Sequence, residues 1–253
     1  MALLKDIVQQ TNELLDVEKY KDYCPNGLQV EGRKDVQTII SGVTASQALL
    51  DAAIEHSADL ILVHHGFFWK GEKEVITGLK KNRIATLIRN DVSLLAYHLP
   101  LDGHISLGNN AQLALKLGLQ VVDRFGPGKL PLGLITEPGS PITKGELVQL
   151  FLAQLSRQPL ILSGSGQDKA YQRIAICTGA AQSFFESAID AGVDAFVTGE
   201  VSEQSYHLAM ESGVDFISAG HHATERFGVM ALGEYLSKEF HVTHKNLEIN
   251  NPV

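Results

Sequence analysis

Residues 40–63 read ISGVTASQALLDAAIEHSADLILV, and this stretch decides the fold. The apolar run at 38–43 predicts a strand, the spacing of apolar residues over 46–57 predicts a helix, and the run at 60–63 predicts a second strand. Strands that alternate with helices indicate an α/β protein, in which helices cover both faces of the sheet.

The same alternation continues on both sides of this stretch. Apolar residues recur near the helical period over 3–15, which predicts an amphipathic opening helix, and a further helix is expected at about 80–89. Strands are expected at 92–96 and, much later in the chain, at 215–219. The α/β interpretation therefore applies to both halves of the chain.

The opening stretch occurs twice. A shift of 135 residues, from 40 to 175, lays it without a gap on AICTGAAQSFFESAIDAGVDAFVT at 175–198. The match preserves the helix face and the entry to the next strand, through the pairs Ala45 with Ala180, Gln47 with Gln182, Asp51 with Glu186, Ala53-Ile54 with Ala188-Ile189, and Asp59 with Asp194. Such similarity indicates an internal duplication.

The duplication extends toward both ends of the chain. A helix expected at 144–155 mirrors the opening helix, and residues 160–164 mirror residues 28–32. The joint falls in FGPGK at 125–129, whose glycines and proline cannot continue a helix. We therefore predict two fused α/β pseudo-repeats, residues 1–125 and 126–253, which together form one functional unit.

Composition places the chain among ordinary globular proteins and argues against some classes of binding partner. Of 253 residues, 44% are apolar and 20% are charged, which suffices for a sizeable core. A net charge of −8 repels phosphate backbones and anionic lipid, and this argues against nucleic acid as a partner. Two cysteines cannot form a disulfide framework, and neither a signal peptide nor an apolar span is visible, so we expect a cytoplasmic protein without a membrane partner.

Histidines and carboxylates stand just after three of the expected strands. Ligands in open α/β sheets gather beyond the carboxyl ends of strands, so these side chains are expected to converge. A shift of 123 residues, from 98 to 221, also lays His98 on His221 and Asp102 on Glu225. The converging residues are His64, His65, His98, Asp102, His221 and Glu225.

Local spacing supports this convergence. Within a regular strand His64 and His65 would face opposite sides, and Gly66 is expected to let the backbone turn so that both imidazoles enter one cavity. The spacing of four between His221 and Glu225 brings both to one face if a helix begins near Gly220.

These residue types point to metal ions. Two carboxylates held close together repel each other unless cations compensate them. Neutral imidazoles with carboxylates suit divalent Fe, Zn, Mn or Ni, and the absence of thiolates disfavours a structural zinc site. Five ligand candidates exceed what one catalytic ion with an open position takes, so we predict two divalent ions per chain that activate water. The predicted ligands are His64, His65, Asp102, His221 and Glu225.

Other residues are candidates for moving protons or orienting ligands: Glu200, His98 and His222. His64-His65 align with Gly199-Glu200, so the second repeat lacks a dihistidine and one metal centre per chain is expected. Glu200 is either a general base or a solvated glutamate. We expect half-buried side chains without a catalytic role at His56, His104, His207, His241 and His244, and a buried strand residue at Cys177.

A basic stretch follows the dihistidine, at Lys70, Lys73, Lys80, Lys81, Arg83 and Arg89. A solvated helix face is the plain interpretation, and a clamp for a substrate phosphate is the sharper one. The neighbouring Phe67-Phe68-Trp69 could pack, contact another subunit or stack a base. Phosphate-loop, dinucleotide-binding, zincin and nucleophile-elbow motifs do not occur in the sequence, which excludes those enzyme classes.

Several blocks of the chain resemble the NIF-three-like family, also labelled the GTP cyclohydrolase I type 2 homologues. The blocks are Asn26 to Gly32, His64 to Gly66, His98 to Asp102, Leu107 to Asn110, Thr198 to Glu200, and Gly220 to Glu225. The resemblance implies a NIF-three-like fold, a dinuclear metal site on the five ligands above, and a toroidal homohexamer. It also implies a cyclohydrolase activity or a role in disposing of damaged nucleotides.

We therefore expect a metal-dependent hydrolase of a small, nucleotide-like substrate. The alternative is a non-catalytic metal-binding scaffold or a regulatory hexameric ring. Binding of DNA through the hole of a ring would need basic residues on its inner wall, and it conflicts with the net charge of −8.

Overall fold

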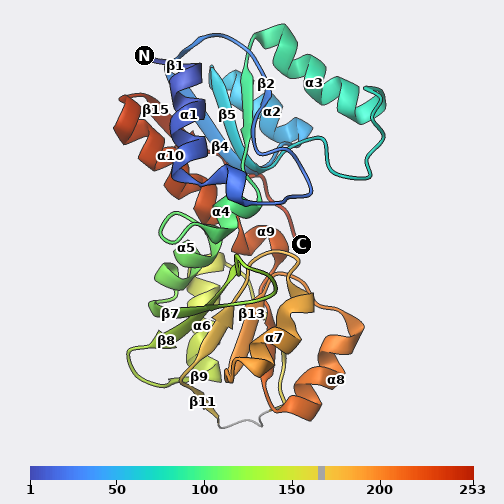
Figure 1. The fold of residues 1–253 in the computed structure, drawn as a ribbon, viewed down its shortest axis with the longest axis vertical. Helices are drawn as coiled ribbons and strands as arrows, with labels where there is room; N and C mark the ends of the chain where they lie inside the picture. The colour runs from blue at the N-terminus through green and yellow to red at the C-terminus, as the bar shows by residue number, and fades with distance from the viewer. Residues whose placement is uncertain (165–168) are drawn as a thin grey trace. The chain divides into compact units, whose positions relative to one another are not determined.

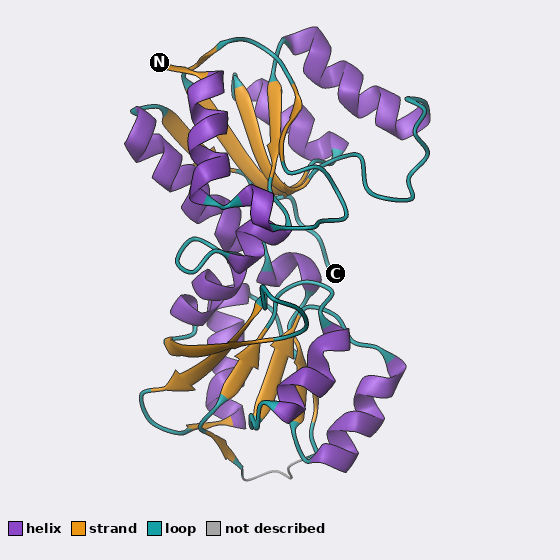
Figure 2. Ribbon diagram, viewed as in Figure 1, coloured by secondary structure: helices purple, strands orange, loops and turns teal. Residues whose placement is uncertain are grey.

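The computed structural model describes residues 1–164 and 169–253, which fold into two compact units of helices and strands (Figures 1 and 2). The first unit comprises Met1–Leu107 and Gly228–Asn250, and the second comprises Gly108–Phe227 and Asn251–Val253. Both units combine a central sheet with packed helices, so the predicted α/β class is confirmed.

The first unit is built on a five-stranded sheet in the order β15-β4-β5-β6-β2. The strands β15, β4, β5 and β6 run parallel, and β2 pairs antiparallel with β6 at one edge. The bounds are β2 Gly27–Val30, β4 Thr38–Thr44, β5 Leu60–His65, β6 Ser93–Ala96 and β15 Thr243–Asn246. The short strands β1 (Ala2–Leu3) and β3 (Asp35–Val36) form a separate pair.

Alternate residues of these strands face two cores, because successive side chains of a strand point to opposite faces. On one face Ile39 and Leu60 pack with the helices α1 and α10, and on the other Ile40 and Ile61 pack with α2 and α3. The helices of this unit are α1 Leu4–Leu14, α2 Gln47–Glu55, α3 Gly78–Asn90 and α4 Leu99–Gly103, with the short η1 Val17–Lys19, and α10 Arg226–Phe240 belongs to it from Gly228 onward. The predicted covering of both sheet faces is therefore observed here.

The second unit has a six-stranded sheet in the order β10-β14-β13-β12-β8-β7. Its strands are β7 Leu119–Phe125, β8 Gly133–Pro138, β10 Leu160–Leu162, β12 Ile174–Ile176, β13 Ala195–Thr198 and β14 Asp215–Ser218. The strands β9 (Ile142–Thr143) and β11 (Ala170–Tyr171) form a separate pair. Its helices are α5 Asn109–Lys116, α6 Lys144–Leu155, η2 Gln182–Phe184, α7 Phe185–Asp190, α8 Glu203–Ser212 and α9 His221–Thr224.

Each unit repeats the same parallel strand pairing. Ile39 lies opposite Leu60 in the first unit, and Ile174 lies opposite Ala195 in the second, so both partners differ by the shift of 135 found in the sequence. In each sheet an antiparallel strand lies next to the last of these parallel strands in the run. These neighbours are β2 beside β6 in the first unit and β10 beside β14 in the second. The two similar stretches of sequence thus adopt the same local strand pairing.

One pair of aspartates shows the duplication at atomic detail. A carboxylate oxygen of Asp59 accepts hydrogen bonds from the amides of Gln37 and Thr38, at 2.9 and 3.0 Å. In the second unit Asp194 accepts from the amides of the equivalent residues 172 and 173, at 2.7 and 3.0 Å. Each aspartate therefore fastens the start of one strand to the turn before the next.

The compact units do not follow the predicted joint at 125–129. The chain leaves the first unit after Leu107 and returns to it at Gly228, because α10 and β15 complete the first unit's core and sheet. The way in which the chain packs does not test how its sequence was duplicated. The proposed repeats 1–125 and 126–253 therefore stay a prediction. Across the described parts of the chain, no helix combines the length and the apolar character needed to cross a bilayer.

Candidate functional site

Three imidazoles of the first unit gather beyond its parallel strands. His64 and His65 end β5, and His98 follows β6 at the start of α4. Ligand atoms of all three lie within 4.8 Å of one another. The ring centroids of His64 and His65 are 4.5 Å apart, and those of His64 and His98 are 5.1 Å apart. Such a group can hold a metal ion.

Hydrogen bonds at Nδ1 orient these rings. His64 is fully buried, and its Nδ1 lies 2.9 Å from the backbone oxygen of Tyr97, so this nitrogen carries the proton. The Nδ1 of His65 lies 3.2 Å from the hydroxyl of Thr44. With Nδ1 engaged in this way, Nε2 is the nitrogen of each ring suited to a metal.

His98 is oriented by a carboxylate that the sequence did not single out. Its Nδ1 lies 2.7 Å from Asp22 Oδ1, and Asp22 also accepts from the amide of Leu99 at 2.9 Å and from the side chain of Asn26 at 2.8 Å. Burial on its own raises the pKa of Asp22, but its hydrogen bonds, with His98 first and then with Asn26 and the backbone amide of Tyr23, outweigh burial and lower the pKa below 3.8. An ionised Asp22 therefore holds the His98 ring.

Gly66 is needed for a different reason from the one expected. Its φ is not positive, so the backbone does not use the freedom of glycine to turn there. A Cβ at this position would instead collide with the side chains of Gln29 and Ala96. Gln29 accepts a hydrogen bond from the amide of Phe67 at 2.6 Å, and this bond holds the loop that follows the dihistidine.

Asp102 lies beside the imidazole cluster. It is buried in α4, and its Oδ1 is 3.5 Å from Nε2 of His64. The amide of Asp102 donates to the backbone oxygen of His98, at 3.1 Å, so the first turn of α4 fixes the carboxylate relative to that histidine. The first unit thus brings together His64, His65, His98 and Asp102.

Cys24 lies near His98 and Asp22, within the same 4.8 Å spacing of ligand atoms. Burial, with the charge of Asp22, raises the pKa of its thiol to about 12. In the absence of a metal this thiol therefore keeps its proton at neutral pH. A metal ion on the sulfur of Cys24 would have to displace that proton.

The second unit places His221 between two carboxylates. His221 begins α9 and Glu225 directly follows it, with Nε2 of the histidine 3.1 Å from Oε2 of the glutamate. The other ring nitrogen, Nδ1, lies 2.7 Å from Oε1 of Glu200. Burial alone would lower the pKa of His221, but the hydrogen bonds and charges of Glu225 and Glu200 raise it to about 9. In the absence of metal this imidazole is protonated at neutral pH.

Close backbone packing makes room for these side chains. Gly179 has a φ of +69°, and a Cβ there would collide with Oε1 of Glu225. A Cβ on Gly199 would stand 2.6 Å from the Cα of His221. Glycines that follow β12 and β13 therefore let the loops approach the buried Glu225, which is 3% exposed.

Of the other predicted residues, some contact the potential metal ligands and some do not. Glu200 contacts His221, and His98 belongs to the imidazole cluster. His222 is buried, with its amide donating to the backbone oxygen of Val253, and it belongs to no potential metal group among the described residues. Structural contacts account for other histidines: His56 with Lys245, His104 with the amides of 106 and 107, His207 with Glu203, and His244 with Ser41.

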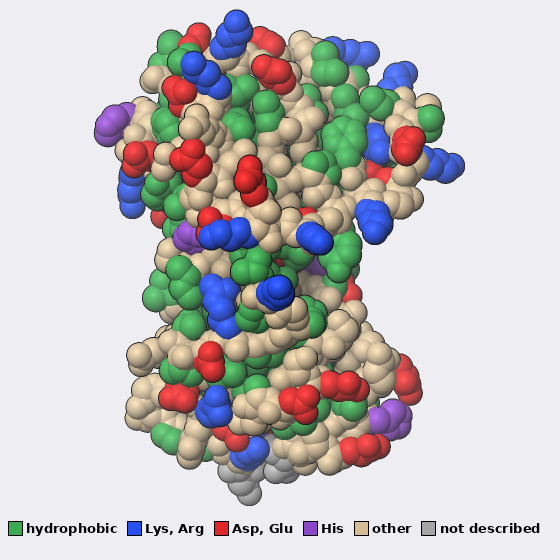
Figure 3. Space-filling view, in the orientation of Figure 1, with side chains coloured by type: hydrophobic (Ala, Val, Ile, Leu, Met, Phe, Trp, Pro, Cys, Tyr) green, Lys and Arg blue, Asp and Glu red, His purple; other side chains and the backbone are tan. Residues whose placement is uncertain are grey.

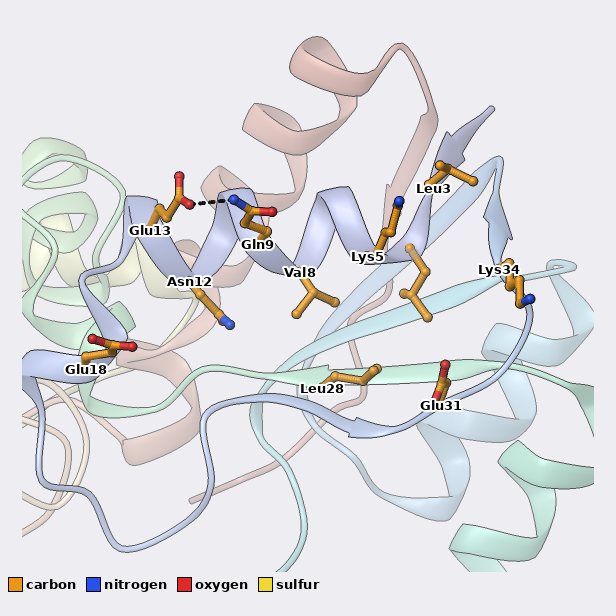
Figure 4. Close-up of a pocket in the computed structure, with 11 residues that line it drawn as sticks. Leu3, Lys5, Val8, Gln9, Asn12, Glu13, Glu18, Leu28, Glu31 and Lys34 are labelled. Carbon is orange, nitrogen blue, oxygen red and sulfur yellow. Dashed lines mark hydrogen bonds between the residues drawn. The ribbon is translucent and has the colours of Figure 1, made fainter.

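Two cavities of the first unit differ in their chemistry. One, of about 810 Å³, lies between α1 and β2 and is lined by side chains such as Val8, Leu28, Glu13 and Lys34 (Figure 4). None of its lining residues is a histidine. The other, of about 460 Å³, is lined in part by His65 and Trp69. The smaller cavity is thus the one that reaches the imidazole cluster.

The chain matches the Duf34/NIF3 (NGG1p interacting factor 3) family over residues 2–252. It belongs to that family. The Duf34/NIF3 resemblance predicted from the signature blocks is therefore confirmed along the whole chain.

Known Duf34/NIF3 proteins resemble this chain over their full length. It is 53% identical to the GTP cyclohydrolase 1 type 2 homolog of Pseudomonas aeruginosa, with 98% of each chain covered. A solved structure described as protein ybgI, of unknown function, has a TM-score of 0.95 at 49% identity and covers 100% of both chains. A Thermus thermophilus protein superimposes with a TM-score of 0.88 at 30% identity, also over 100% of both chains.

Proposed function

We propose that this Duf34/NIF3 protein carries a dinuclear metal centre that activates water for the hydrolysis of a small, nucleotide-like substrate. The proposed ligands are His64, His65, Asp102, His221 and Glu225. The observation that carries the proposal is the pair of imidazoles His64 and His65, whose Nδ1 atoms are engaged in hydrogen bonds beside the buried Asp102. Rings held in this way present Nε2 to a metal without a further rearrangement.

Chain connectivity supports the use of donors from both units. Asp102 stands shortly before the chain first passes between the units, at Leu107, and Glu225 stands shortly before it returns, at Gly228. Both carboxylates are buried. Buried carboxylates with imidazole partners suit divalent Fe, Zn, Mn or Ni.

When bound, two divalent ions supply Lewis-acid stabilisation and activation of water. The chain's own residues would orient ligands and move protons. Glu200 accepts from Nδ1 of His221 and so fixes which nitrogen faces Glu225. His98 donates from Nδ1 to Asp22, which leaves a lone pair at Nε2 that can accept a proton from water. We assign His222 no step, because its described contacts connect it with the chain terminus.

A substrate screen tests the hydrolase proposal. Metal-free protein would be loaded with Mn, Fe, Zn or Ni and offered nucleotides and other phosphate or amide compounds. Glu225→Gln is the control, because it removes a charged ligand and changes few atoms. We expect hydrolysis by the loaded wild type and a loss of at least about a hundredfold in the variant. Full activity in Glu225→Gln would contradict the proposal, and metal binding without turnover would favour a scaffold.

We also propose that the chain assembles into a homohexamer, as the family resemblance implies. Sedimentation equilibrium measures this directly. A mass six times that of one chain is the expected result, and a monomer at micromolar concentration would contradict it.

A further inference from the structure

The basic cavity is defined as the 460 Å³ cavity lined by His65, Trp69, Lys73, Lys80 and Arg83, and among its lining residues only His65 is a proposed metal ligand. Its volume falls within the roughly 300–1,000 Å³ typical of small-molecule sites. His65, an imidazole of the cluster that could hold a metal ion, is among its lining residues. A molecule that fills the cavity therefore contacts both that imidazole and the basic residues.

The lining of the cavity is mainly basic, whereas the chain as a whole carries a negative net charge. Among the residues that line it, three are basic and only Glu72 is acidic, although the chain carries −8 overall. Lys80 is held by Glu72 at 3.0 Å and by the backbone oxygen of Lys73 at 2.8 Å. On the face drawn in Figure 3, Lys and Arg side chains gather over α3 and the loop before it. The cavity thus favours an anion.

Two of the cations have no acidic partner. Within residues 1–164 and 169–253, neither Lys73 nor Arg83 forms an ion pair. Arg83 is half-buried on the second turn of α3, and it lines the cavity. A guanidinium in that position binds phosphate through paired, charge-assisted hydrogen bonds.

The N-terminus of α3 adds further positive charge to that of the basic side chains in the cavity. Its first turn contains Lys80 and no acidic residue, and Thr77 at its N-cap forms no side-chain capping bond. Cations are unfavourable at this end of a helix, because the helix dipole is positive there. An anion in the adjoining cavity would compensate both the dipole and the side chains.

Trp69 lines the same cavity as the basic residues and lies beside two of the histidines. Its Nε1 donates to the backbone oxygen of Gly66 at 3.2 Å, which fixes the ring. The ring lies edge-on to His98, with centroids 4.9 Å apart, and 5.8 Å from the centroid of His65. An indole held in this way can stack an aromatic base.

We propose that the basic cavity binds the phosphate of a phosphorylated small molecule through Arg83 and Lys73, and stacks its ring on Trp69. This inference rests on the proposed function, since it places the substrate beside the metal donor His65. It names the substrate class of that site as a nucleoside phosphate.

Calorimetric titration of the full-length protein, with and without bound Mn²⁺, tests the assignment. Three probes separate its parts: adenosine monophosphate, adenosine, and ribose 5-phosphate. We expect adenosine to bind about tenfold or more weakly than adenosine monophosphate, because it lacks the phosphate. Equal affinities for these two probes, or no binding of either phosphate compound at millimolar concentration, would overturn the proposal.

Matched variants locate the binding. Arg83→Gln and Lys73→Gln should each weaken the binding of adenosine monophosphate about tenfold, whereas Arg89→Gln, in the last turn of α3, should leave it unchanged. Trp69→Leu should weaken the binding of adenosine monophosphate more than the binding of ribose 5-phosphate, because only the former has a base to stack. An equal loss in Arg89→Gln would overturn the assignment.

Metal content, measured for each variant, keeps the two proposals apart. We expect Arg83→Gln to retain the metal of the wild type while losing phosphate affinity. Binding of adenosine monophosphate by a protein that takes up no metal ion at all would refute the proposed function and preserve this inference. Metal binding with equal affinity for adenosine and its monophosphate would do the reverse.

Discussion

At the scale of one residue, the missing side chain of Gly179 leaves room for the carboxylate of Glu225. A Cβ there would collide with Oε1 of Glu225, and its φ of +69° disfavours a side chain. Gly192 has the same φ, but a Cβ there meets no atom within 4 Å. Both alanine variants should therefore lose about 1 kcal/mol of stability through backbone strain, and only Gly179→Ala should also weaken metal binding, by at least about tenfold.

Chelator-buffered titrations measure these metal affinities, and urea unfolding measures the stabilities. Equal metal affinities for Gly179→Ala and Gly192→Ala would show that the close approach to Glu225 has no bearing on the metal.

The pKa of His221 gives a prediction for pH. A proton and a metal compete for Nε2, and the raised pKa of about 9 keeps the ring protonated through neutral pH. Metal affinity should therefore rise with pH up to about 9 and level off above it. Glu200→Gln removes one carboxylate that raises this pKa, so the rise should end at a lower pH.

Calorimetry in buffers of different ionisation enthalpy measures the accompanying proton release. The wild type should release more protons than Glu200→Gln at pH 7. An identical pH profile for the two proteins would show that His221 does not ligate the metal.

At the residue scale, side-chain chemistry made part of the site predictable. The pattern of histidines after strands identified His64, His65 and His98, because strand ends converge in this class of fold. Asp22 was missed, because its role arises from a long-range hydrogen bond to His98. The backbone oxygen of Tyr97, which orients His64, carries no signal in a sequence.

At the scale of elements, the two equivalent aspartates should stabilise the two sheets alike. Asp59→Ala leaves the amides of Gln37 and Thr38 without their acceptor, and Asp194→Ala does the same at 172 and 173. Each variant should lose about 1–3 kcal/mol of stability, with the larger loss for the more buried Asp59.

Urea unfolding of these variants tests the effect, with Asp51→Ala as the control. Asp51 is exposed on α2, where its carboxylate accepts a hydrogen bond from the side chain of Gln47 on the same helix. A loss in Asp51→Ala as large as that in Asp59→Ala would mean that bonds to the strand starts are not the cause.

Most elements could be predicted, because apolar periodicity is a local property. The expected helix at 3–15 is α1, and the expected strand at 60–63 is β5, which extends through the dihistidine to His65. The packing of α10 with the first unit could not be predicted, because the sequence pattern of a helix shows its apolar face without showing which core covers it.

At the scale of the whole molecule, we propose one dinuclear centre per chain, with His64, His65, Asp102, His221 and Glu225 as its ligands. It follows that removal of a ligand from either unit must lower the metal content of the chain. Separate sites in the two units would behave differently, because a variant in one unit would leave the other site intact.

Elemental analysis of protein that has been stripped, reloaded and desalted tests this claim most directly. We expect about two divalent ions per wild-type chain, a loss of metal in both His64→Asn and Glu225→Gln, and no loss in the control His207→Asn, whose side chain is exposed. More than two ions per wild-type chain, or an unchanged metal content in either ligand variant, would contradict the account.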